Sequence, residues 1–427
     1  MTTARGAGPP ASGPGDGGAS TPPATSVLRD RNFLLYFVGV VVSEVGIRGT
    51  FAINLYHVFL LTGSTASVGF VGLFQFIALV LLAPLGGALA DRLDRRRVVQ
   101  VTQAASMLVS AALAVATFAD VITVWQIYFS VLLNTAALTF DSAARRALIP
   151  AVVARHHVVK AFALVNPGRE LAYLTGPALG GLLVAVGGPG LMYAFDAVSY
   201  TVLIGMLSLL RLTPMEQPVH QVSIWRSMRD GIDYVRSRPI VWQLLALDFV
   251  TMLFGAWRVI LPALAEDILM VGPTGYGLLN SAVPAGALVG SWIVYRAIDR
   301  LRGGRIILVA TASFGFACIA LAQSRGLAMA LAAAWALGVS DAMWSTVQQA
   351  AIQVETPDAI RGRVSALSSM GAKGGPALGS MNIGLIAGAI GPVAALSVGA
   401  LVPIGAAALV ATVSPGVRDY RMPAVPT

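Results

Sequence analysis

Long apolar stretches, interrupted only by short polar or Gly/Pro-rich segments, follow one another along almost the whole chain. A helix needs about 20 residues to cross the roughly 30 Å hydrocarbon layer of a bilayer, and about twelve stretches meet that requirement. They are continuously apolar and do not alternate, which predicts helices and excludes the strands of a barrel. The predicted spans are 33–59, 66–90, 98–119, 122–144, 162–187, 190–211, 241–265, 275–297, 305–323, 326–350, 364–390 and 392–413.

Composition supports this interpretation. Of 427 residues, 56% are hydrophobic and only 11% are charged, and the mean hydropathy is +0.76. Such a chain cannot bury its apolar surface in a water-soluble fold, so we expect an all-α integral membrane protein. Cys318 is the only cysteine and lies inside a predicted span, which excludes disulfides and cysteine-based metal sites. No metal or cofactor is expected.

The chain divides into five predicted units. Residues 1–28, rich in Gly, Pro, Ser, Thr and Ala without a signal-peptide pattern, are expected to form a disordered cytoplasmic tail. Two six-helix bundles follow at 29–212 and 240–413, joined by a cytoplasmic linker at 213–239. Residues 414–427 form a second cytoplasmic tail.

Positive charge is concentrated on one side of this arrangement. The formal net charge is +9, and most Lys and Arg residues fall in segments that are cytoplasmic if both termini are inside. Only Arg325 falls in a predicted outer loop, while Arg48, Arg169, Arg258 and Lys373 lie at membrane depth. The positive-inside rule therefore fixes the orientation, and the charge requires no nucleic-acid partner.

Within the linker, apolar Ile224, Trp225, Met228, Ile232 and Val235 recur at helical spacing while arginines fall between them. This pattern predicts an amphipathic helix on the inner membrane face, with a merely solvated linker as the alternative.

The two halves also resemble each other. Gly176-Pro177-Ala178-Leu179-Gly180 in the fifth span recurs as Gly375-Pro376-Ala377-Leu378-Gly379 in the eleventh, at an offset near half the chain. This is typical of a parallel repeat of six plus six helices.

Gly86-Gly87-Ala88-Leu89-Ala90-Asp91-Arg92, followed by further arginines, links the second and third spans. It resembles the loop signature of the major facilitator superfamily of secondary transporters, which implies that family's twelve-helix fold of two bundles. The resemblance implies that Asp91 touches the start of the eleventh helix and holds the inner gate shut, with Arg145 or Arg146 as ionic partners. The alternative is arginines that only anchor a loop. The expected gating residues are Gly87, Asp91, Arg92, Arg95, Arg96, Arg145 and Arg146.

The fifth span contains Gly176, Pro177, Gly180 and Gly181, and a proline at membrane depth among glycines suits a moving seam between helices. These residues resemble the antiporter motif of drug and proton exchangers, although Ala163 and Ala172 replace that motif's upstream glycines. Glycine and proline also occur in membrane helices of proteins that are not exporters.

Ionisable residues inside predicted spans are candidates for function because they are costly in hydrocarbon. Glu44 and Arg48 are spaced i,i+4 and can pair or line the cavity. Proton coupling needs a carboxylate that protonates in one access state, and Glu44 is the first choice, followed by Asp248, Glu170 and Asp341. For each, a structural salt bridge is the alternative. The candidates for coupling or for lining the cavity are Glu44, Arg48, Asp141, Arg169, Glu170, Asp248, Arg258, Asp341 and Lys373.

A closer resemblance extends over most spans. Phe140-Asp141-Ser142-Ala143-Ala144-Arg145 and Arg258-Val259-Ile260-Leu261-Pro262-Ala263-Leu264-Ala265 are similar to sequences of the enterobactin-exporter branch, also called transmembrane secretion effectors. So are Leu61-Thr62-Gly63-Ser64 and Gln353-Val354-Glu355-Thr356-Pro357-Asp358. The resemblance implies a self-sufficient monomer that exports a siderophore or drug from bacteria.

The expected function is therefore export of a small organic molecule across the bacterial plasma membrane by alternating access, as a proton antiporter and not an enzyme. No Gly-x-x-x-x-Gly-Lys-Ser/Thr loop is present, which argues against direct ATP drive. The alternatives are a proton-coupled uptake permease of the same fold, an integral-membrane enzyme and a lipid flippase. The acids are scattered singly over different helices, which argues against the enzyme.

Overall fold

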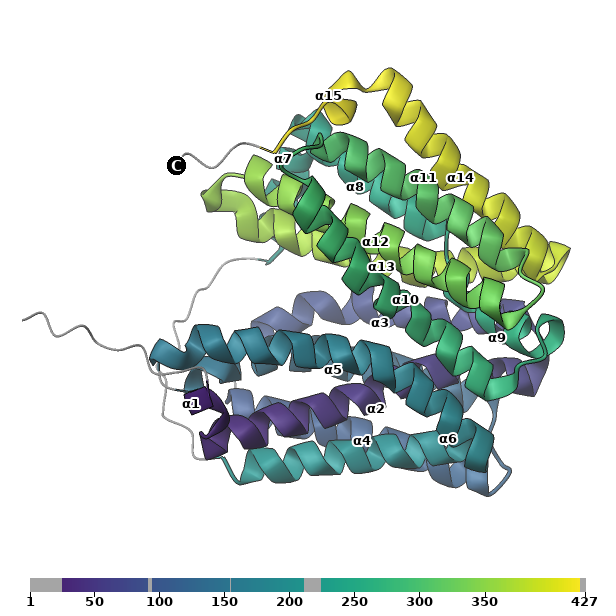
Figure 1. The fold of residues 1–427 in the computed structure, drawn as a ribbon. Coiled ribbons are helices and arrows are strands. Elements are labelled where there is room, and N and C mark those ends of the chain that lie inside the picture. Colours follow the sequence, from purple (N-terminus) through teal and green to yellow (C-terminus); the bar gives the residue numbers. More distant parts are fainter. Residues whose placement is uncertain (1–24, 91–93, 154, 211–223, 423–427) are drawn as a thin grey trace, which may run out of the picture.

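A computed structural model describes residues 25–90, 94–153, 155–210 and 224–422, and within these ranges the regular elements are helical (Figure 1). The first half contains α1 (Thr25–Leu28), α2 (Arg31–Thr62), α3 (Thr65–Ala90), α4 (Arg95–Phe118), α5 (Val124–Val152), a 3-10 turn (Arg155–His157) and α6 (Val158–Ser208). Helix α6 is interrupted at Gly187 and Gly188, where φ of Gly188 is 74°. Only glycine adopts this backbone without strain, so α6 holds two membrane-length segments.

The second half contains α7 (Ile224–Ser237), α8 (Pro239–Phe254), a 3-10 turn (Trp257–Ile260), α9 (Leu261–Ala263) and a π-helical turn, η3 (Leu264–Ile268). It continues with α10 (Gly272–Ala297), α11 (Gly303–Ala322), α12 (Leu327–Glu355), α13 (Asp358–Ile390), α14 (Pro392–Val413) and α15 (Pro415–Arg418). The predicted span 241–265 is therefore not one regular helix, because it breaks after Phe254.

Eight helical stretches in the described residues are long and apolar enough to cross a membrane. They include the broken stretch Pro239–Ile268 and α6, which bends back on itself at its glycines. Three further long helices, α3, α5 and α13, contain 26, 29 and 33 residues. The long segments thus follow the order and approximate positions of the predicted spans.

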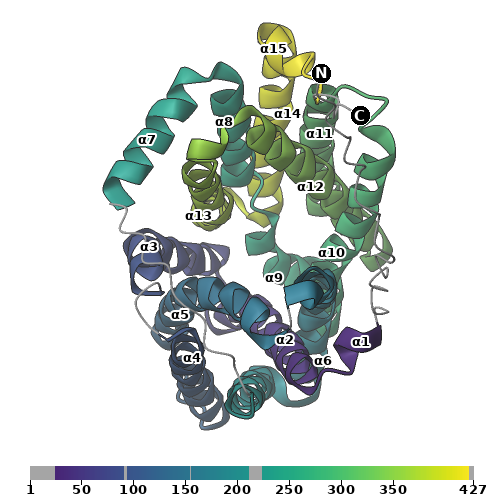
Figure 2. The same ribbon diagram turned by 90° about the vertical axis from the view of Figure 1, so that its left-hand side faces the viewer.

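The helices form two bundles, α2–α6 and α8–α14 (Figure 2). The bundles meet mainly where α3 packs on α13 and α6 packs on α10. Small residues allow this approach: a Cβ on Gly384 would lie 2.6 Å from Cα of Gly69, and one on Gly277 would lie 3.1 Å from Cα of Gly181. Both crossings lie toward the end of the molecule that carries α9.

At the opposite end, which carries α1, α7 and α15, the bundles diverge (Figure 1). In the predicted orientation this end is the cytoplasmic face, which would make the shape inward-open.

Helix α7 covers the segment predicted to be amphipathic, and it packs on the C-terminal bundle. The Arg363 guanidinium on α13 lies 2.7 Å from the Asp230 carboxylate. The Tyr234 hydroxyl donates a 2.5 Å hydrogen bond to the Glu355 carbonyl. Buried Val235 joins an apolar cluster with residues of α8, α12 and α13. The linker helix is therefore attached to the second bundle; its placement on the membrane surface and the exact limits of the units stay predictions.

Candidate functional site

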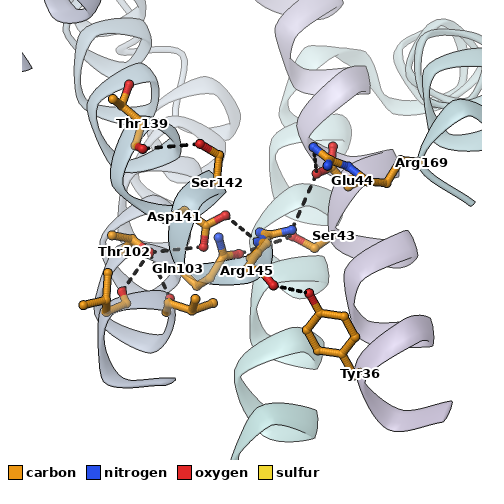
Figure 3. A network of polar contacts seen from close by, with 12 residues as sticks. Tyr36, Ser43, Glu44, Thr102, Gln103, Thr139, Asp141, Ser142, Arg145 and Arg169 are labelled. Atoms are coloured by element: carbon orange, nitrogen blue, oxygen red, sulfur yellow. Dashed lines mark hydrogen bonds and ion pairs between the residues drawn. The ribbon is translucent and has the colours of Figure 1, made fainter. Parts of the chain in front are cut away.

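Three helices of the first bundle place three guanidinium groups around one carboxylate, and Figure 3 shows Arg145 and Arg169 beside Glu44. The Glu44 side chain on α2 is 1% exposed. Its oxygens lie 3.0 Å from Arg48, 3.6 Å from Arg145 and 3.3 Å from Arg169. The i,i+4 pairing of Glu44 with Arg48 follows from helical spacing, whereas Arg145 and Arg169 arrive from α5 and α6.

Arg145 connects this group to a second acid. Its Nε forms a short ion pair with Asp141, one turn earlier on α5, and the Thr102 hydroxyl of α4 lies 3.4 Å from Asp141. The Arg145 carbonyl accepts a 2.8 Å hydrogen bond from Tyr36. A buried charge is tolerated only when it is paired, and removal of one partner costs about 3–5 kcal/mol. The network therefore fastens α2, α4 and α5 together.

The basic members of the network are more accessible than the acid. The Arg48 and Arg169 side chains are 17% and 33% exposed, against 1% for Glu44. The Arg48 guanidinium carbon also lies 3.8 Å from the centroid of the Tyr173 ring on α6, a cation–π contact. The accessible side of this network is thus cationic and aromatic.

The second bundle presents a cavity of about 260 Å³. Asp248 of α8, Asp341 of α12 and Arg258 of the 3-10 turn contribute charged groups to its lining, and Ser345, Gln348 and Ser380 are among its polar residues. Arg258 is exposed, and its guanidinium carbon lies 4.7 Å from the centroid of the Trp257 ring.

The break between α8 and the 3-10 turn places Arg258 and Trp257 in this cavity. Gly255 occupies the break, and a Cβ there would lie 2.5 Å from the Phe314 ring and 2.7 Å from the Thr251 carbonyl oxygen. Glycine is therefore required for close packing of the broken helix on α11, a signal that the hydropathy pattern does not reveal.

The repeated Gly-Pro elements form the seam between the bundles. A Cβ on Gly277 of α10 would lie 2.6 Å from the Pro177 carbonyl oxygen, in the first copy. A Cβ on Gly72 of α3 would lie 2.3 Å from the Ala377 carbonyl oxygen, in the second copy. Each copy thus brings its backbone against a glycine of the opposite bundle. Gly176, Gly180 and Gly181 are buried in α6.

Polar contacts add to the seam near α9. The Tyr56 hydroxyl of α2 donates a short hydrogen bond to Glu266 in η3. The Tyr276 hydroxyl of α10 donates to the Ala52 carbonyl at 2.7 Å, and the Tyr56 and Tyr276 rings lie 4.8 Å apart. These contacts join the bundles at the predicted outer face, and sequence reasoning did not select Glu266, Tyr276 or Tyr173.

The predicted gating residues divide into three groups. Asp91 and Arg92 lie outside the described residues, as do the side chains of Arg95 and Arg146, while Gly87 is in α3. Arg96 donates to the Ser208 carbonyl at 2.8 Å and so caps the end of α6. Arg145 is bound to Asp141 and Glu44 inside the bundle; the pairing of Arg145 or Arg146 with Asp91 stays a prediction, because Asp91 lies outside the described residues.

Two further predicted cavity residues are exposed on the helices that form the seams. Glu170 lies on α6, one residue after Arg169, and Lys373 lies on α13.

Comparison with known proteins agrees with this architecture. The family model of transmembrane secretion effectors matches residues 23–420. The enterobactin exporter EntS of Citrobacter koseri is 27% identical over 404 residues, which cover 92% of each chain. EntS of Escherichia coli O1:K1 is 28% identical over 378 residues, 86% of each chain.

Solved structures show the same fold. The nucleoside transporter NupG matches with a TM-score of 0.70 and 14% identity, covering 88% of this chain and 97% of the transporter. An inward-facing bacterial homologue of the lysosomal transporter Spinster matches with a TM-score of 0.68 and 13% identity, covering 96% and 100%. A D-xylose–proton symporter gives 0.68 and 12%, covering 92% and 99%. The two bundles meet along paired seams, and the family model matches nearly the whole length of this chain. The chain therefore belongs to the transmembrane secretion effector family and has the major facilitator fold.

Proposed function

We propose that the protein exports a small organic molecule, a siderophore or a drug, across the bacterial plasma membrane in exchange for protons. The observation that carries the proposal is a charged cavity in the second bundle, together with bundles that diverge at the basic, predicted cytoplasmic face. Cargo enters this shape from the cell interior. The relatives named as enterobactin exporters support the direction, and the Gly-Pro seam at α6 supports antiport.

Proton exchange requires a carboxylate that shares the cavity with cargo. Asp248 and Asp341 line the cavity, and Asp341 is the acidic neighbour of Arg258. Glu44 is held by three guanidinium groups and is 1% exposed. We therefore assign coupling to Asp341 with Asp248, and a role in holding the first bundle together to Glu44, the first choice from sequence.

The assignment predicts different losses for the two kinds of substitution. Asp341→Asn should keep the protein folded but make export independent of the proton gradient. Glu44→Gln should reduce the amount of folded protein, because it removes the negative charge that pairs with three guanidinium groups. The measurement is efflux against an imposed pH gradient in vesicles, normalised to inserted protein. Gradient-dependent efflux in Asp341→Asn, together with gradient-independent efflux in Glu44→Gln, would return coupling to Glu44.

Direction is tested in cells that express the full chain. Accumulation of a panel of siderophores and antibiotics is compared with and without a protonophore. Export lowers accumulation, and the protonophore restores it. Higher accumulation in expressing cells would instead identify an uptake permease of the same fold. We expect a monomer with both termini in the cytoplasm.

A further inference from the structure

A second cavity, of about 260 Å³, lies inside the first bundle between α2, α5 and α6. The described residues that line it include no carboxylate, whereas Asp248 and Asp341 line the cavity of the second bundle. Its polar side chains are those of Tyr36, Arg145, Asn166 and Arg169. The lining of this cavity is therefore cationic.

The buried wall of this cavity holds a guanidinium group whose hydrogen-bond donors are not all used. Arg145 is 6% exposed. Its Nη1 atom lies 3.6 Å from the Glu44 carboxylate and forms no hydrogen bond with the described residues. Its Nη2 atom lies 3.5 Å from the Ser43 hydroxyl. Both distances exceed the usual N–H···O range of about 2.7–3.2 Å. A buried donor without an acceptor is unfavourable, so an acceptor on a bound molecule stabilises Arg145.

The charges around this cavity do not balance. Arg145 lies between Asp141 and Glu44 (Figure 3). The whole ion-pair network contains these two acids and three arginines, because Arg48 and Arg169 also pair with Glu44. Buried charges are stable when they are paired. One bound negative charge therefore makes the network neutral, and two would leave it negative.

The rest of the lining is apolar. Each helix contributes to it, since α2 supplies Val40, α5 supplies Ile149, and α6 supplies Phe162 and Val165. Three of these residues are 2–3% exposed. The cavity thus suits a molecule with one anionic group on a small apolar body, and its volume is near the lower end of the range for small-molecule sites.

The mouth of the cavity lies on the side of α6 that faces the second bundle. Asn166 is exposed, and the Arg169 side chain is 33% exposed. At 3.6 residues per turn these two residues share a face of α6 with Pro177. That face packs on α10, because a Cβ on Gly277 would lie 2.6 Å from the Pro177 carbonyl oxygen. The mouth therefore opens before the seam, toward the end where the bundles diverge (Figure 1).

We propose that this cavity is a subsite for a singly charged anionic group of the cargo, with a carboxylate held by Arg145 and Arg169. This inference rests on the proposed function, since it names the chemistry of one end of the cargo. A guanidinium group matches the two oxygens of a carboxylate in its own plane. The subsite lies in the first bundle and is separate from the acidic cavity of the second.

The test is a ligand-observed NMR titration of the purified full-length protein in an uncharged detergent at pH 7. The probe is cyclohexanecarboxylate. Its comparators are cyclohexanecarboxamide, which is neutral, cyclohexylmethylamine, which is a cation, and a cyclohexane dicarboxylate, which carries two negative charges. We expect the monocarboxylate to bind at least about tenfold more tightly than each comparator, the factor for one lost charge-assisted hydrogen bond. Equal binding of the amide, or tighter binding of the amine, would overturn the proposal.

Two arginine variants separate the cavity from the network. Arg169→Gln and Arg48→Gln each remove one positive charge and each leave Glu44 with two guanidinium partners. Only Arg169 lines the cavity. Arg169→Gln should weaken cyclohexanecarboxylate about tenfold, and Arg48→Gln should weaken it far less. An equal loss in both variants would show that the probe responds to the charge of the network and not to this cavity.

A third variant blocks the mouth and keeps every charge. Asn166 is exposed and lines the cavity, so Asn166→Trp should fold normally and abolish saturable binding of the probe. Signal that persists in Asn166→Trp would assign the binding to the micelle or to another site. Displacement of the probe by phosphatidylglycerol but not by phosphatidylcholine would assign the cavity to a lipid headgroup and refute its role in binding cargo.

The outcomes for binding and export are distinguishable. The titration needs no membrane gradient, so selective binding of the monocarboxylate without efflux in cells would refute export and leave the anion site standing. Efflux in cells, together with binding that Arg169→Gln and Asn166→Trp do not change, would refute the anion site and leave export standing.

Discussion

Replacing Gly181 by alanine tests whether the seam between α6 and α10 controls access to the cavity. A Cβ at Gly181 would lie 2.3 Å from the Pro273 carbonyl oxygen and 2.9 Å from Cα of Gly277. Favourable contacts between such atoms are at about 3.5 Å, so the two helices must move apart by about 1 Å. Overpacking of this kind costs about 1–3 kcal/mol.

The cost applies only while the seam is closed. In an outward-open arrangement α6 and α10 separate at this end and the added methyl group is accommodated. A penalty of about 1–3 kcal/mol therefore shifts the population by about 5- to 150-fold toward that arrangement. Gly181→Ala should fold and insert normally but transport poorly, because it seldom returns to the inward-open shape.

Cysteine labelling measures this shift directly. Cys318, the only cysteine, is replaced by alanine. Thr65→Cys is introduced at the first residue of α3. Thr65 is 7% exposed, and a Cβ on Gly384 of the opposite bundle would lie 3.1 Å from its carbonyl oxygen. A membrane-impermeant maleimide should label Thr65→Cys faster when Gly181→Ala is also present.

The matched control lies on the same helix. A Cβ at Gly205 would meet nothing within 4 Å, so Gly205→Ala should leave labelling unchanged. If Gly181→Ala labels Thr65→Cys no faster than Gly205→Ala does, the close approach at Gly181 does not restrict access and the reasoning fails.

Three further predictions concern other contacts. Tyr56→Phe removes the hydrogen bond to Glu266, which is worth about 1.5–3 kcal/mol for a charged acceptor. It should raise the rate at which the maleimide labels Thr65→Cys about tenfold or more. An unchanged rate would show that this hydrogen bond does not hold the seam. Asp91→Asn should lower efflux while the protein stays inserted, and normal efflux would contradict the gate assignment. The hydrogen bond from Arg418 holds the pKa of Asp419 below its usual value, so ionised Asp419 stabilises the fold above that value and this contribution is lost as pH falls through the lowered pKa. Asp419→Asn should therefore lower the melting temperature more at pH 7 than at pH 3; an equal effect at both would show that the charge is not responsible.

Hydropathy was sufficient to predict most of the fold. A membrane helix must be apolar, must hydrogen-bond its own backbone N–H and C=O groups, and must be long enough to cross the bilayer. The predicted span 392–413 coincides with α14 (Pro392–Val413), and 98–119 falls close to α4 (Arg95–Phe118). The seventh span is different. Its break at Gly255 and its π-helical turn leave the apolar pattern intact, so the hydropathy pattern predicts one continuous helix where the structure has α8 followed by three short elements.

The candidate site was less predictable for a related reason. Helical spacing alone pairs Glu44 with Arg48, but the approach of Arg145 and Arg169 depends on how α5 and α6 rotate against α2. Tyr173 was missed because an aromatic residue in an apolar span resembles ordinary packing until a guanidinium is seen above it.

The broken seventh span connects the cavity with the seam. Arg258, just after its break, lines the cavity, and Glu266 near its end accepts the hydrogen bond from Tyr56. Both residues lie in 3-10 or π-helical turns, which are less regular than the surrounding helices and often mark functional sites. The first bundle, by contrast, is fastened by its buried ion pairs. Arg258 and Glu266 are eight residues apart, so this irregular segment links the cavity to the contact at the predicted outer face, whereas the ion pairs around Glu44 hold α2, α5 and α6 to one another. Gly255, which has no room for a side chain, is the position at which a substitution should disturb both ends of this segment at once.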